Sequence, residues 1–144
     1  MNFDNEISEC KVQLYEGLGK VLSVMERAYG SFAESSQDTN AATANYYHLC
    51  GEIITESEGV ANITSRISAT IQKADIECLP EAVCALGALL DIYVSFREVL
   101  EEYLSECESV IKIKDTPFPA RTLVRQTDIL IRKISMLRKD IQRI

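Results

Sequence analysis

The chain has 144 residues, of which 47% are hydrophobic and 26% are charged, which fits one globular domain with its own core rather than a disordered segment. Its formal net charge of −7 argues against nucleic acid as the partner of the whole domain. No apolar run approaches the roughly 20 residues of a membrane span, and the acidic start MNFDNEISEC lacks the apolar stretch of a secretory signal, so we expect a cytoplasmic protein.

The first predicted element is a helix over residues 4–35. Apolar residues recur there every seven positions in two rows offset by four, which is the spacing of one buried helix face. The polar stretch ESSQDTNAA at 34–42 follows, and we interpret it as a loop or a loosened helical joint. The two rows are Ile7, Leu14, Val21 and Ala28, and Leu18, Met25 and Phe32.

Two further helices are predicted over 42–76 and 80–112. The first has an apolar residue at every seventh position from Tyr46 to Ala74, and it ends before Pro80, which suits the first turn of the next helix. The helix over 80–112 has the most regular pattern, because its 3–4 spacing is unbroken, as in coiled-coil packing. Its rows are Leu86, Tyr93, Leu100 and Cys107, and Leu89, Phe96, Tyr103 and Val110.

The stretch KDTPFPARTLVR at 114–125 separates the third helix from a fourth over 120–144. Pro117 and Pro119 both lack the amide that a helix interior uses, so an ideal helix cannot continue unaltered. We expect a full turn here, and a kink in one long helix is the alternative. The apolar pattern of the fourth helix still runs at Ile144, so we expect the chain to be part of a longer protein.

Four apolar stripes without any strand pattern predict an all-α fold in a single domain over 1–144. An antiparallel bundle is the ordinary way to bury four such stripes. An elongated, coiled-coil-like arrangement of the same four amphipathic helices is the alternative, and the joint at 114–125 decides between the two.

Charge is distributed unevenly along the chain. Residues 1–110 carry 6 basic and 19 acidic side chains, a net charge of −13, whereas 111–144 carry 9 and 3, a net charge of +6. In the fourth helix a basic residue recurs every seven positions opposite the Leu/Ile stripe. This predicts contact with an acidic membrane or partner; the alternative is a solvated face, or one that pairs with the glutamates of the third helix. The predicted contact residues are Arg121, Arg125, Arg132, Lys133, Arg138 and Lys139.

The only histidine, His48, invites comparison with histidine phosphotransfer domains. The lysine of their motif is absent, however, and the glycine comes one place early at Gly51. We therefore interpret His48 as a partly buried histidine beside Tyr46 and Tyr47. A single histidine also cannot supply the paired Glu-x-x-His ligands of a metal bundle, so we expect no metal site and no cofactor.

The five cysteines are odd in number and form no C-x-x-C pair. This pattern favours buried, reduced thiols over a disulfide framework or a zinc site. Cys50 lies on a different helix face from His48, so no base is placed to activate it as a nucleophile. We therefore expect no enzyme activity.

The stretch LLDIYVSFREVLEEYLSECESVIKIKD, with ARTLVRQ after it, resembles the BAR domains that accompany sorting nexins. An acidic helix rich in Tyr and Leu is followed there by basic residues on a continuing apolar heptad, and YHLCGEIITESEGVANI is compatible with the preceding long helix. The resemblance implies a dimeric, curved helical module on phosphoinositide-rich endosomal membranes. The chain departs from the family in its helices, since those of BAR domains are longer and commonly three in number.

These observations predict a non-catalytic helical scaffold, a BAR-like membrane-trafficking module that binds an acidic membrane surface or a partner through its basic last helix. The main alternative is a soluble protein-interaction bundle that belongs to a larger complex without membrane contact, and a histidine phosphotransfer domain is a remote one. The expected partners are a protein or a second copy of the chain, contacted through helix faces, and an anionic membrane. We expect neither nucleic acid nor a small-molecule substrate, and a cytoplasmic location with peripheral attachment to membranes.

Overall fold

The computed structural model describes residues 2–35, 38–112 and 119–144. Within these ranges the chain forms four α-helices and no strand: α1 (Phe3–Glu34), α2 (Thr39–Ile76), α3 (Pro80–Lys112) and α4 (Pro119–Arg143). Every helix bound lies within three residues of the predicted one. The prediction of an all-α fold is therefore confirmed.

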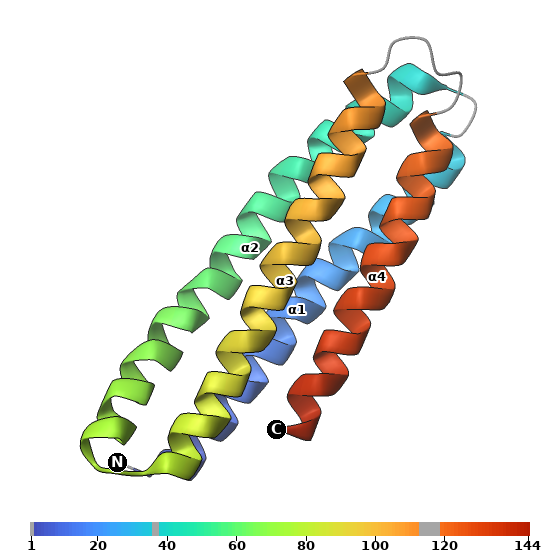
Figure 1. Ribbon diagram of the computed structural model, residues 1–144. Coiled ribbons are helices and arrows are strands. Elements are labelled where there is room, and N and C mark those ends of the chain that lie inside the picture. Colours follow the sequence, from blue (N-terminus) through green and yellow to red (C-terminus); the bar gives the residue numbers. More distant parts are fainter. Residues whose placement is uncertain (1, 36–37, 113–118) are drawn as a thin grey trace.

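The four helices form an antiparallel bundle (Figure 1). α1 packs against α2 and α4, and α3 packs against the same two helices, so the first and last helices close the bundle. α1 and α3 lie diagonally across the core, as do α2 and α4. The outer faces of α2 and α4 consequently point away from each other.

A hydrophobic core extends along the bundle, and all four helices contribute to it. The seven-residue rows of the sequence supply this core, because a helix face with 3–4 spacing stays directed at its neighbours along the helix. The largest fully buried side chains include Leu14, Leu18, Met25, Phe32, Tyr46, Ile67, Leu86, Leu89, Phe96, Leu123, Leu130 and Ile134.

Polar side chains cap the starts of α1 and α2. The side-chain oxygen of Asn2 accepts hydrogen bonds from the backbone N–H groups of Asp4 and Asn5 at 3.1 and 3.4 Å. A carboxylate oxygen of Asp38 accepts from the N–H of Ala41 at 3.1 Å. α2 therefore begins three residues before the expected position, because the cap at Asp38 and not the apolar stripe determines where the helix starts.

A Schellman motif ends α2 and leads into α3. The N–H of Leu79 donates to the carbonyl of Ala74 at 3.0 Å, and the N–H of Cys78 donates to that of Asp75 at 3.1 Å. This motif needs one residue in the left-handed region, which glycine usually supplies. Here Cys78 adopts it with a φ of 55°, alone among the described non-glycine residues. Pro80 then occupies the first turn of α3, as predicted.

The chain reverses between α3 and α4, which lie side by side (Figure 1). The hydroxyl groups of Tyr103 and Thr127 are 2.9 Å apart in a buried hydrogen bond between these helices, and Thr127 also donates to the carbonyl of Leu123 at 2.6 Å. The packing of α4 beside α3 agrees with the expected full turn and excludes one long kinked helix. The turn itself, over residues 113–118 with Pro117, lies outside the described residues.

Candidate functional site

The outer face of α4 is the strongest candidate for a binding surface. α4 carries seven basic and two acidic side chains, a net charge of +5. Its buried Leu/Ile row faces the core, so residues half a turn away face solvent. The exposed cations on that side form what we call the α4 basic stripe: Arg121, Arg125, Arg132, Lys139 and Arg143.

Acidic residues of α4 neutralise the stripe only weakly. Arg132 pairs with Asp128 at 3.2 Å and Arg143 pairs with Asp140 at 3.3 Å, each on the neighbouring helix turn. Both arginine side chains remain more than three-quarters exposed. Such pairs contribute about 0–1 kcal/mol, so another anion can replace the aspartate at little cost in free energy.

A glutamate of α3 pairs with a cation at the edge of α4. Lys133, at the edge of α4, has its Nζ 3.7 Å from Oε2 of Glu102 on α3, in an exposed pair. Arg125 and Lys139 form no ion pair with any described residue and extend into solvent. Among the described residues, pairing between α3 and α4, the alternative considered for the basic helix, therefore involves Lys133 at its edge and neither Arg125 nor Lys139 at its centre.

Arg138 lies apart from the other five predicted contact residues. Its guanidinium carbon is 3.9 Å from the centre of the Tyr15 ring, and its Nε donates to the carbonyl of Tyr15 at 3.2 Å. Gly19 provides the space, since a Cβ there would lie 2.8 Å from Nη2 of Arg138. Arg138 thus holds α4 against α1 and is half-buried, because its helix position points toward α1 and not outward.

Met136 is a member of this surface that the sequence reading missed. Its side chain is 64% exposed among the cations of the stripe. The sequence spacing could have indicated its position, because Met136 follows Arg132 by one helix turn and so lies on the same face of the helix. An exposed apolar side chain among cations is typical of helices that lie in a lipid interface.

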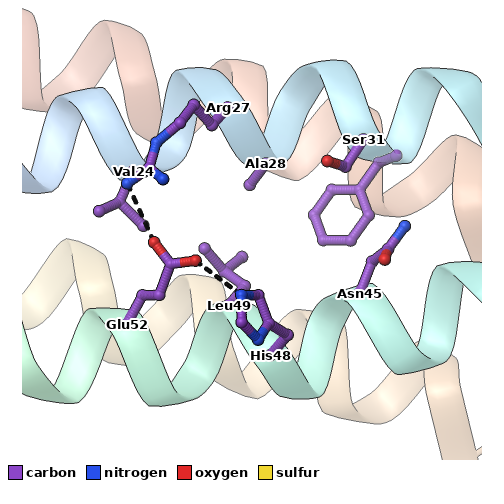
Figure 2. Close-up of a pocket in the computed structure, with 9 residues that line it drawn as sticks. Val24, Arg27, Ala28, Ser31, Asn45, His48, Leu49 and Glu52 are labelled. Atoms are coloured by element: carbon purple, nitrogen blue, oxygen red, sulfur yellow. Dashed lines mark hydrogen bonds and ion pairs between the residues drawn. The ribbon is translucent and has the colours of Figure 1, made fainter.

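A polar pocket of about 250 Å³ lies between α1 and α2 (Figure 2). Glu52 lies at one end of it: Nη2 of Arg27 donates to Oε2 of Glu52 at 3.0 Å, and Nε2 of His48 lies 2.9 Å from Oε1 (Figure 2). The apolar side chains of Val24 and Leu49 also line the pocket. Glu52 is therefore paired with Arg27 across the two helices and with His48 within α2.

The position of His48 differs from the expected one. Its side chain is 79% exposed and pairs with Glu52, whereas we expected partial burial beside Tyr46 and Tyr47. The structure also brings a cation, Arg27, to the same pocket from another helix, which sequence spacing could not indicate. Glu52 lies between the two, and its negative charge opposes the binding of a phosphoryl group there.

The five cysteines differ in their exposure to solvent. Cys10 and Cys107 are buried and Cys50 is half-buried, whereas Cys78 and Cys84 are exposed, and all five are free thiols. Burial raises the pKa of the Cys107 thiol to about 12 and also raises the pKa of Cys10. The expectation of buried thiols is thus confirmed for Cys10 and Cys107 and wrong for the two exposed residues.

Comparison with known proteins found no matching family model, no matching curated protein and no matching solved structure. In the described part of the chain, no group of three or more His, Cys, Asp or Glu side chains is placed to hold a metal ion. None of the described helices has the combined length and apolar character that crossing a membrane requires.

Proposed function

We propose that the protein is a non-catalytic helical scaffold that attaches peripherally to anionic membranes through the α4 basic stripe. The observation that carries the proposal is the exposure of five cations along one face of α4, opposite a buried apolar row. A cation near an anionic lipid surface contributes about 1 kcal/mol, so several in a line give useful affinity without a lipid pocket. Met136 adds apolar contact at the interface.

The rest of the bundle supports attachment by this face alone. The chain outside α4 is acidic, with seven acidic and two basic residues on α3 and a net charge of −7 for the whole chain. An anionic surface repels those regions, so it orients the molecule with α4 toward the lipid. The proposed mechanism is electrostatic and weakens with salt.

The finer part of the proposal is a BAR-like role in membrane trafficking. The resemblance of the α3–α4 region to the BAR domains of sorting nexins supports it, as does the basic surface on the last helix. In the structure α4 folds back onto α1 and α3 within one chain. We therefore assign the lipid contact to the outer face of α4 and not to a concave surface.

Co-sedimentation with vesicles tests the proposal. The wild-type chain is expected to sediment with phosphatidylcholine vesicles that contain phosphatidylserine, and to remain in solution with phosphatidylcholine alone or at high salt. The triple variant Arg125→Gln, Arg132→Gln, Lys139→Gln loses about 3 kcal/mol of attraction, which lowers the partition constant on the order of 100-fold.

A second triple variant with the same change in net charge is the control. Lys20→Gln, Lys73→Gln and Arg97→Gln remove three exposed cations of α1, α2 and α3. This variant is expected to bind like the wild type. Equal losses in both variants, or no binding of the wild type at low salt, would contradict membrane attachment and leave the soluble protein-interaction bundle as the better account.

A further inference from the structure

We infer that the groove between α2 and α3 is a docking site for a basic amphipathic helix of a protein partner. The groove has a volume of about 320 Å³ and is lined mainly by apolar side chains. It lies on a different side of the bundle from the α4 basic stripe, and the inference does not depend on membrane binding. Its lining includes Ile54, Ala61, Tyr93, Leu100, Glu58 and Glu101.

Exposed apolar side chains gather at this groove. Ile54, which lines it, is 61% exposed, and Tyr47 on the same helix is 63% exposed. These two residues are seven apart and Ala61 follows after seven more, so they form one ridge along α2. In a surface helix such positions are ordinarily polar, and a group of them marks a binding site.

The shape of the groove favours a helix as the occupant. α2 and α3 are neighbours that run side by side (Figure 1). The groove is lined by residues of both helices, from Ile54 to Ala61 on α2 and from Tyr93 to Leu104 on α3, so it follows the helix direction. Apolar residues of a third helix at i, i+3, i+4 and i+7 fit such a depression, as ridges fit into grooves. Among the described residues no strand edge is present to receive an extended peptide.

The charge of the rim indicates a basic occupant. Glu58 on α2 and Glu101 on α3 line the groove and are exposed. Glu108, also exposed, follows Glu101 by seven residues and so lies on the same face of α3. Arg97 is the cation of the lining, and its Nη2 is 3.4 Å from Oε1 of Glu101 in an exposed pair. Such a rim therefore favours a partner helix whose apolar ridge is flanked by basic residues.

The groove and the basic stripe can be occupied at the same time. α4 lies diagonally opposite α2, so a helix seated between α2 and α3 does not cover the stripe. A partner bound there extends away from the surface that α4 contacts. The protein would then link a basic helix of a partner to an anionic surface.

Fluorescence anisotropy with a designed peptide tests the inference. The probe is a labelled peptide of about 18 residues with leucines on one helix face and lysines on the other, a helix-in-groove ligand. Wild-type protein is expected to bind it, and Ile54→Glu, which puts a charge into the groove, is expected to weaken binding by about tenfold or more. Val12→Glu is the matched control, because Val12 is 52% exposed in a groove between α1 and α4.

Two further peptides separate groove binding from simple charge attraction. One has the same composition in scrambled order, so it keeps the charge without the apolar face, and one has glutamate in place of each lysine. Both are expected to bind much more weakly than the probe. Equal binding of the scrambled peptide, or equal affinity of the Ile54→Glu and Val12→Glu proteins, would overturn the inference. Circular dichroism of both variants verifies that the bundle is folded.

Discussion

At the scale of single residues, Cys78 shows how one position can carry a backbone conformation that its side chain disfavours. It occupies the left-handed position of the Schellman motif between α2 and α3, with a φ of 55°. A Cβ in this region costs about 1–2 kcal/mol, which glycine avoids. The motif forms nevertheless because its two backbone hydrogen bonds and the following Pro80 favour the same turn.

The variant Cys78→Gly is therefore expected to raise the free energy of unfolding by about 1 kcal/mol, since the strain is relieved while glycine adds some freedom to the unfolded chain. Urea denaturation followed by circular dichroism measures it. Glu77→Gly, one residue earlier at a negative φ of −83°, is the control and is expected to destabilise. A Cys78→Gly protein no more stable than the wild type would show that the turn carries no strain.

At the scale of elements, Gly17 determines how closely α1 approaches α2. A Cβ on Gly17 would lie 3.2 Å from Cγ2 of Val60 and 3.3 Å from Cδ1 of Ile63, so the two helices approach each other closely here. Gly51 on α2 is also helical, but a Cβ there would meet nothing within 4 Å. The close packing of α1 and α2 therefore requires a glycine at position 17, whereas position 51 has room for a side chain, although both lie inside helices.

Gly17→Leu is expected to lower the free energy of unfolding by about 1–3 kcal/mol, because the added atoms force α1 away from α2. Gly51→Leu, its control, is expected to be neutral or to stabilise by up to about 1 kcal/mol through better helix propensity. Thermal or urea unfolding of the two variants measures the difference. Similar effects of the two substitutions would contradict a close helix contact at Gly17.

The helices were predictable from the sequence because their apolar rows repeat without interruption, as between Leu86 and Cys107. The start of α2 was not, because Asp38 caps the helix from within a polar stretch that reads as a loop. The exposure of Arg125, Arg132 and Lys139 followed from their seven-residue spacing. Arg138, one residue before Lys139, points toward Tyr15 instead, and this depends on which helix α4 packs against.

At the scale of the whole molecule, the order of the helices around the bundle separates two surfaces. α4 presents cations at one corner, and the groove between α2 and α3 opens on a different side. Neither the groove nor the pocket around Glu52 could be predicted from the sequence, because each joins residues of two helices whose contact is tertiary. The central claim is that the molecule meets an anionic membrane with α4 and turns α2 away from it.

The measurement that tests this claim most directly is the emission of an environment-sensitive fluorophore at two positions. With Cys78 and Cys84 replaced by serine, a thiol is introduced by Met136→Cys on α4 or by Ile54→Cys on α2, both exposed in the structure. On vesicles that contain phosphatidylserine, the account predicts a blue shift at position 136 and almost none at position 54. An equal shift at both positions, or a larger one at 54, would contradict it.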